Sequence, residues 1–228
     1  MKILVVADRE ERSLWDFWTK TTAERMSDVS LILSAGDLDA DYLEFLVTML
    51  NVPLVYVRGN HDTGYEEKAP GGCIDADGIP VTVECHDRSS DDPEGSVRSV
   101  RILGLGGSMR YNPNASDMYT ENEMRARVRR AEFRLRTDRF RGAGEGFDIL
   151  LTHAPCKGYG DLDDMPHTGF ECFNEILDRY HPSFHVYGHV HEEYIGGSPG
   201  GDRGYWRRLG HPSGTELINA SGHYIIEI

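Results

Sequence analysis

Six side chains that commonly bind metal ions are spread along the chain at separate places. They are two carboxylates, one amide and three imidazoles: Asp8, Asp37, Asn60, His153, His189 and His191. This mixture of ligands suits Mn, Fe or Zn better than Ca²⁺, which prefers oxygen ligands alone. Two such ions ~3.5–4 Å apart can hold a phosphoryl group and acidify a water between them. The residue types therefore predict a metal centre that activates water.

Buried strands must bring these side chains together, and apolar runs stand in the right places to do so. The runs rich in Val, Ile and Leu are residues 2–7, 29–35, 52–57, 101–105, 147–152, 184–187, 216–219 and 223–228. Five of them deliver a metal-capable residue just past their carboxyl ends. In open α/β sheets ligands bind at that edge, so the pattern favours one shared site.

Each of these residues also has an ordinary structural explanation. Asp8 and Asn60 could be turn or cap residues, and His153 could be a hydrogen-bonded core histidine. His189 and His191 are two residues apart, so a regular strand would place both on one face, and Gly188 permits a bend before them. The coincidence of five strand ends, rather than any single residue, indicates the site.

Segments with a helical apolar period alternate with the predicted strands. Their inner faces are formed by Leu14, Trp15, Trp18 and Met26; by Leu43, Leu46, Val47 and Leu50; by Met124, Val128, Ala131 and Leu135; and by Phe170, Phe173, Ile176, Leu177 and Tyr180, before Pro182. Residues 78–105 predict an antiparallel hairpin with a polar tip at 86–95, and the last two runs predict another that turns at 220–222. Residues 196–214 predict a surface loop without strand or helix. Together the patterns predict an α/β fold (α+β in stricter schemes) in which helices flank two packed sheets, as one domain over residues 1–228.

Composition and charge narrow the classes of partner. The formal net charge of −14 argues against a protein that coats nucleic acid, but it does not disfavour a small phosphorylated substrate, because bound cations dominate the local field. No apolar run approaches the ~20 residues that span a bilayer, and the first apolar run is too short for a signal peptide. The four cysteines form neither a C-x-x-C pair nor a Cys-x5-Arg phosphate loop. We expect a cytoplasmic protein that has no membrane association.

An arginine-rich segment, residues 119–141, needs separate consideration because it contains eight arginines. Glu121 with Arg125, and Glu132 with Arg136, have the i,i+4 spacing that supports a helix. The arginines then form a solvated helix face or, as an alternative, a contact surface for an anionic substrate or nucleic acid.

The polar motifs resemble, in the same order, those of the calcineurin-like metallophosphoesterases. The matching elements are Asp8, Gly36-Asp37, Gly59-Asn60-His61-Asp62, His153 and Gly188-His189-Val190-His191. The resemblance implies a four-layer α/β/β/α sandwich of two mixed sheets between helices. It also implies that Asp37 bridges two ions, with Asp8 and His191 on the first ion and Asn60, His153 and His189 on the second. His61 would protonate the leaving oxygen, and Asp62 would orient His61.

One position departs from the family pattern, whose first motif is usually Asp-x-His. Here the third position is Glu10. In one alternative, Glu10 ligates the first ion through oxygen, and the third carboxylate then lowers the Lewis acidity of the ion and favours Mn²⁺. In the other, Glu10 does not reach the first ion, which is then weakly bound or lost. We predict two divalent ions, with Mn²⁺ favoured and Fe, Zn and Mg as alternatives.

Two further side chains are candidates for substrate binding. Arg110 follows the strand and glycine-rich turn at residues 101–108, and His167 precedes a predicted helix. The leading hypothesis is metal-dependent hydrolysis of a phosphomonoester or phosphodiester. The alternatives are a binding or scaffold module that kept the fold but lost the chemistry, and a nuclease that holds a polyanion on residues 125–141.

Overall fold

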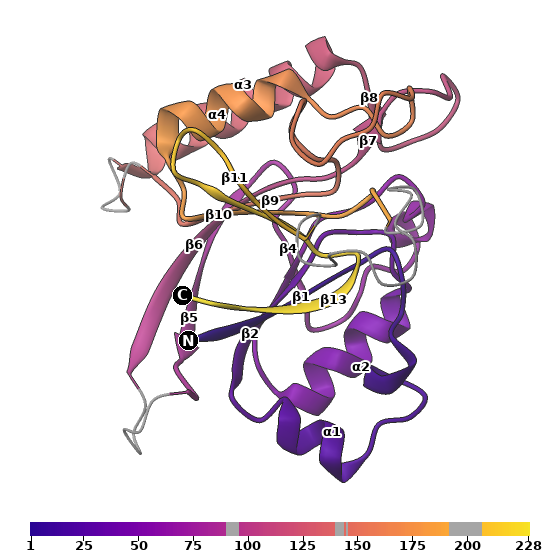
Figure 1. The fold of residues 1–228 in the computed structure, drawn as a ribbon, viewed down its shortest axis with the longest axis vertical. Helices are drawn as coiled ribbons and strands as arrows, with labels where there is room; N and C mark the ends of the chain where they lie inside the picture. Colours follow the sequence, from indigo (N-terminus) through magenta and orange to yellow (C-terminus); the bar gives the residue numbers. More distant parts are fainter. Residues whose placement is uncertain (90–95, 140–143, 145, 192–206) are drawn as a thin grey trace.

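Two β-sheets packed face to face form the centre of the computed structural model, which describes residues 1–89, 96–139, 144, 146–191 and 207–228 (Figure 1). The first sheet has the strand order β13-β1-β2-β3-β4 and the second has the order β11-β12-β10-β9-β6-β5. The first contains β1 (Lys2–Ala7), β2 (Val29–Ser34), β3 (Leu54–Tyr56), β4 (Ile74–Asp75) and β13 (Gly222–Glu227). The second contains β5 (Pro80–His86), β6 (Val97–Leu105), β9 (Ile149–Thr152), β10 (Phe184–Tyr187), β11 (Arg208–Gly210) and β12 (Glu216–Asn219). Short strands β7 (Ser108–Met109) and β8 (Met118–Tyr119) pair separately.

Helices cover the outer face of each sheet, which completes four layers. On the side of the first sheet lie α1 (Lys20–Arg25) and α2 (Ala40–Leu50), and on the second sheet lie α3 (Glu121–Arg139) and α4 (Glu171–Tyr180) (Figure 1). The short 3-10 helices η1 (Arg12–Leu14) and η2 (Thr63–Glu66) add Leu14 and Tyr65 to the apolar cluster that α2 forms with the first sheet. Both sheets mix parallel and antiparallel pairs. The predicted mixed α/β sandwich is confirmed. Among the described helices, none combines the length and apolarity needed to cross a membrane.

The central strands are buried on both faces, which explains why they are continuous apolar runs. In β1, Ile3 and Val5 point into the core between the sheets, whereas Leu4 and Val6 point toward α2. This alternation follows from the two-residue period of a strand. The core between the sheets therefore fixes the distance between two sets of strand ends.

The predicted inner faces of α2, α3 and α4 are buried, apart from Val47 and Tyr180, which are partly buried. Asp39 caps the start of α2, and its carboxylate accepts the Asp41 N–H at 2.8 Å. His181 caps the end of α4 in a left-handed conformation, so the helix stops before Pro182, as predicted. The first predicted helix is wrong as a single helix, because the segment is divided into η1 and the short α1, although its predicted inner face does pack in the core: Leu14 and Met26 are buried, and Trp15 and Trp18 are partly buried.

Three arginines of α3 bond to residues outside the helix, namely Arg125, Arg127 and Arg134. Arg125 pairs with Glu121, as predicted, and also with Glu175 of α4. The predicted partner of Glu132 is wrong, since Glu132 pairs with Arg179 of α4 instead of Arg136. A partner on the packed helix offers a contact that sequence spacing within α3 does not reveal. Residues 140 and 141 of the arginine-rich segment lie outside the described residues.

The two predicted hairpins have different outcomes. Strands β5 and β6 pair antiparallel, as expected, although residues 90–95 of the tip lie outside the described residues. The second prediction is wrong, because β12 pairs with β10 and β11 while β13 pairs with β1 in the other sheet. Residues 220–222 carry the chain between the sheets, with the Ala220 N–H bonded to Tyr187 and Gly222 paired with Ala7.

Part of the predicted loop at residues 196–214 is also corrected. Arg208–Gly210 forms strand β11, which pairs antiparallel with β12 at the edge of the second sheet. Residues 196–206 of that loop lie outside the described residues. A three-residue edge strand is too short to show a strand period in the sequence.

His185 of β10 is an example of a histidine that serves packing. It is completely buried, with Nε2 2.7 Å from the Thr152 hydroxyl and Nδ1 3.1 Å from the Cys156 sulfur. Burial lowers its pKa to about 3, with His211 contributing in the same direction. The ring therefore stays neutral in the folded state, as expected for a core residue.

We predict that His185 makes the protein less stable in acid. The unfolded residue gains a proton near its ordinary pKa of 6.5, whereas the folded residue stays neutral until about pH 3, so stability is lost as pH falls below 6.5. Between pH 7 and 5 this contributes a loss of about 2 kcal/mol at 1.36 kcal/mol per pH unit. Urea unfolding in EDTA should show that His185→Leu lacks this part of the loss; equal pH dependence in both proteins would contradict the assignment.

Candidate metal centre

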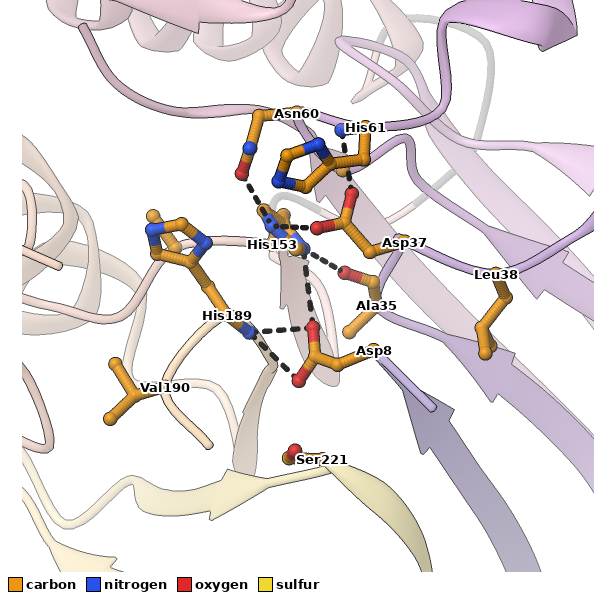
Figure 2. A network of polar contacts seen from close by, with 12 residues as sticks. Asp8, Ala35, Asp37, Leu38, Asn60, His61, His153, His189, Val190 and Ser221 are labelled. Atoms are coloured by element: carbon orange, nitrogen blue, oxygen red, sulfur yellow. Dashed lines mark hydrogen bonds and ion pairs between the residues drawn. The ribbon is translucent and has the colours of Figure 1, made fainter. Parts of the chain in front are cut away.

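The carboxyl ends of strands from both sheets meet at one edge of the molecule, where the predicted ligands gather (Figure 2). Asp8, Asp37 and Asn60 follow β1, β2 and β3 of the first sheet. His153 and His189 follow β9 and β10 of the second. The sequence-predicted convergence on one site is therefore seen in the structure for these five residues.

Unusual backbone conformations turn these side chains toward one another. Asp8, Asp37 and His189 have positive φ angles of 63°, 56° and 69°. Non-glycine residues rarely adopt this left-handed region, and such conformations cluster at functional sites. Three of them at three strand ends indicate that the backbone is shaped for the site.

Glycines next to two of the ligands allow their turns to pack in direct contact. A Cβ atom on Gly36 would lie 2.3 Å from the Gly59 nitrogen, and one on Gly59 would lie 2.0 Å from an Asp37 carboxylate oxygen. Both distances are far below van der Waals contact. The glycines of the Gly-Asp and Gly-Asn motifs are therefore required so that Asp37 and Asn60 can lie side by side.

His153 stands at the centre of a group of hydrogen-bond acceptors (Figure 2). Its Nδ1 lies 2.8 Å from the Ala35 carbonyl oxygen, to which it donates. Its Nε2 faces the Asn60 Oδ1 at 3.0 Å and the Asp37 Oδ2 at 3.4 Å. In a neutral ring that donates from Nδ1, the Nε2 atom carries a lone pair, so three acceptors point at one another and need a proton or a metal ion between them.

The ionisation of this group reflects the same need. Burial alone would lower the pKa of His153, but the Asp37 carboxylate, together with Asp8 and the Ala35 carbonyl, outweighs it and raises the pKa to about 9. Burial would raise the pKa of Asp37, but His153 holds it below its ordinary value. A proton on His153 satisfies the acceptors when no ion is bound, and a divalent cation can take its place.

His189 completes the candidate ligand group. Its Nε2 lies 2.8 Å from the Pro166 carbonyl oxygen, so a ring that donates there leaves Nδ1 as the ligand atom. Burial lowers its pKa to about 3, which keeps the ring neutral. One ligand atom each from Asp37, His153 and His189 lies within 4.8 Å of the others. Backbone carbonyls thus fix the orientation of both imidazoles, as is usual for metal-binding histidines.

Asp8 and His191 form a second, looser group. The Asp8 carboxylate is buried, and burial raises its pKa. Its two oxygens accept the His189 backbone N–H at 2.9 and 3.1 Å. The His191 Nε2 lies 3.8 Å from the Asp8 Oδ2, so the two predicted ligands of the first ion are neighbours.

Glu10 contacts the start of α2. Its Oε1 accepts the Asp39 N–H at 3.2 Å, at the start of α2. The side chain lines a cavity of about 500 Å³ together with Asp37, His61 and Asp39. Ligation by Glu10 stays a prediction, and this contact favours the alternative in which Glu10 does not reach the first ion.

His61 and Asp62 occupy different environments. The His61 side chain is exposed and lines the cavity, while its backbone N–H donates to the Asp37 Oδ1 at 2.8 Å. The buried Asp62 carboxylate accepts the N–H groups of Asp37, Gly59 and Leu38 at 2.8, 2.7 and 3.2 Å. Burial raises its pKa to about 6. Asp62 thus ties together the two turns that carry Asp37 and Asn60, a role that the sequence did not reveal.

The two predicted substrate-binding residues are placed differently. The Arg110 guanidinium donates to the Met118 carbonyl oxygen at 3.0 Å and pairs with Glu123 at 2.9 Å, which ties it to the start of α3. His167 lies beside the ligand group, with its ring centroid 5.2 Å from that of His189. Substrate contact by either residue stays a prediction.

Tyr111 is a neighbour of the site that sequence reasoning missed. Its hydroxyl oxygen lies 3.5 Å from the Asn60 Nδ2, and its side chain is partly exposed. Only its position directly after Arg110 could have drawn attention to it, because a tyrosine in a loop carries no metal-binding signature.

A sequence profile described as calcineurin-like phosphoesterase matches residues 1–193. The chain belongs to this family. Among curated relatives, the UPF0046 protein K07C11.7 of Caenorhabditis elegans is 25% identical over 179 residues, which cover 73% of this chain and 58% of the relative. The human metallophosphoesterase domain-containing protein 1 is 43% identical over 53 residues, or 22% of this chain and 16% of the relative.

The fold also has a counterpart among solved structures. The structure of TT1561 from Thermus thermophilus aligns with 97% of this chain and 89% of its own, with a TM-score of 0.52 and 13% identity. That likeness supports the fold alone. The curated relatives named above are matched over 58% of their length or less, so the family membership carries the expectation of phosphoesterase chemistry but not a substrate.

We predict that Asp62→Ala destabilises the protein by several kcal/mol. The change leaves the N–H groups of Asp37, Leu38 and Gly59 without their acceptor, and each buried unpaired group costs about 1–3 kcal/mol. Urea unfolding in EDTA measures the effect apart from any bound ion. Asn112→Ala is the control, because its side-chain oxygen accepts an exposed N–H, that of Asn114. Equal losses in the two variants would contradict the role assigned to Asp62.

Proposed function

We propose that this chain is a metal-dependent hydrolase that cleaves a phosphomonoester or phosphodiester with an activated water. The observation that carries the proposal is the meeting of His153 Nε2, Asn60 Oδ1 and Asp37 Oδ2 at 3.0 and 3.4 Å, where a divalent cation can replace the proton of His153. Family membership supports the reaction class. Two divalent ions, with Mn²⁺ favoured over Fe, Zn and Mg, would be held by Asp37, Asn60, His153 and His189 and by Asp8 and His191.

The chain's own groups have distinct tasks in this proposal. Divalent ions, when bound, acidify water and stabilise the charge of the phosphoryl oxygens. His61 faces the cavity beside Asp37, where its ring can protonate the departing oxygen of a substrate. The carbonyl groups of Ala35 and Pro166 orient the imidazoles, and Asp62 holds the two ligand turns together.

The surroundings of the site favour a small substrate over a polyanion. The cavity beside His61 is lined by Glu10, Asp39 and Asp41, and its one lysine, Lys68, pairs with Asp41. Arg125 of α3 is likewise paired, with Glu121 and Glu175. These contacts support a small phosphorylated partner rather than nucleic acid. The cytoplasmic location stays a sequence-based prediction.

The direct test combines metal analysis with hydrolysis of p-nitrophenyl phosphate and bis(p-nitrophenyl) phosphate in the presence of Mn²⁺. We expect turnover that EDTA abolishes and Mn²⁺ restores. The His153→Ala variant should lose both this turnover and the ion that His153 binds. Absence of hydrolysis with every divalent ion, with metal content near zero, would instead favour the scaffold that kept the fold alone.

We predict that His61→Ala slows turnover by about 10²–10⁴-fold, the usual contribution of a general acid, while metal content is unchanged. The backbone N–H that His61 donates to Asp37 remains in this variant, so the ligand turn is preserved. His86→Ala, at an exposed histidine at the end of β5, is the control. Loss of metal along with activity would show that His61 is not the acid.

A further inference from the structure

The two halves of the metal centre offer ligand sets of different quality. We infer that the half formed by Asp8 and His191 binds a divalent ion more weakly than the half formed around His153, and that Glu10 braces the start of α2 without ligating an ion. This inference rests on the proposed function, since it concerns the ions that the proposed reaction uses.

The contacts of Glu10 explain why it stays away from the ion. Its carboxylate accepts the Asp39 N–H, while the Asp39 carboxylate accepts the N–H of Asp41. These are N–H groups at the first turn of an 11-residue helix, α2, whose dipole stabilises negative charge at this end. A move of Glu10 toward Asp8 and His191 would leave the Asp39 N–H without this partner and remove a carboxylate from the helix start.

The half around His153 is prepared for an ion before one arrives. It offers four side chains, which are Asp37, Asn60, His153 and His189, and carbonyl oxygens at 2.8 Å fix both imidazoles. Ligand atoms of Asp37, His153 and His189 already lie within 4.8 Å of one another. Little rearrangement is needed on binding, so little of the binding free energy is lost.

The other half offers fewer side chains. Without Glu10 it offers Asp8, His191 and the shared Asp37. Both oxygens of Asp8 already accept the His189 N–H, and His191 lies 3.8 Å from Asp8. Fewer ligands give a weaker site. Metal concentration then sets the fraction of chains that carry both ions.

The test is Mn²⁺ binding to the whole chain, measured by titration calorimetry and by electron paramagnetic resonance, which detects coupling between paired ions. We expect two classes of site, with dissociation constants at least about tenfold apart. Asn60→Ala should weaken the tighter class by about 10-fold or more, as loss of a well-placed ligand does. Binding of two ions with the same dissociation constant to the unmodified protein would overturn the inference.

Substitutions at Glu10 decide its role. Glu10→Gln keeps an oxygen that can accept the Asp39 N–H but removes the charge, so both classes should stay within about 2-fold of the unmodified protein. Glu10→His supplies the imidazole of the usual motif and should tighten the weaker class by about 10-fold or more. A 10-fold loss of Mn²⁺ affinity at the weaker class of site in Glu10→Gln would show that Glu10 is a ligand.

Failure of the inference can be told apart from failure of the proposed function, because binding is measured without substrate. Two unequal classes, both filled, without hydrolysis would overturn the function and support the inference. Hydrolysis by a protein with two equal classes would support the function and overturn the inference. Far-ultraviolet circular dichroism confirms that each variant is folded.

Discussion

Three lone pairs, from Asp37, Asn60 and the Nε2 atom of His153, lie together at the edge where the two sheets meet. Buried acceptors without a donor between them are costly, so this arrangement persists only if a proton or a metal ion neutralises it. Asp37 and Asn60 come from the first sheet and His153 from the second. The apolar core between the sheets therefore determines whether the three can meet at all.

The surrounding structure maintains this close approach. Gly36 and Gly59 let the two ligand turns touch where any side chain would collide. The Asp62 carboxylate accepts hydrogen bonds from N–H groups of both turns. The Ala35 carbonyl oxygen accepts a hydrogen bond from the Nδ1–H group of His153. Fold, backbone conformation and polar contacts thus act on the same small group of atoms, as expected where a site is preorganised for catalysis.

The sequence revealed those features that depend on local order. Strands buried on both faces are continuous apolar runs, and the residue after each run is visible, so Asp8, Asp37 and His153 could be assigned to one edge. Pairing between distant segments could not be read in this way. The turn at residues 220–222 has the same composition whether the next strand pairs with β12 or crosses to β1.

Side-chain partners supplied by distant backbone were equally hidden. Asp62 accepts hydrogen bonds from the N–H groups of residues 37 and 38, and Glu10 accepts one from the N–H of Asp39. These contacts exist only after the turns have folded against each other. The resemblance to a family predicted which residues would bind metal. It did not indicate how a glutamate would behave where the family usually has an imidazole.

Binding of a divalent cation by the group around His153 can be measured by thermal unfolding with and without Mn²⁺. A ligand at 100 times its dissociation constant stabilises the folded state by about 2.7 kcal/mol, which for a chain of this length raises Tm by roughly 5–10 °C. We expect such a rise in the unmodified protein and little or none in His153→Ala. An unchanged Tm in the unmodified protein, or the same rise in both, would show that this group does not bind the ion.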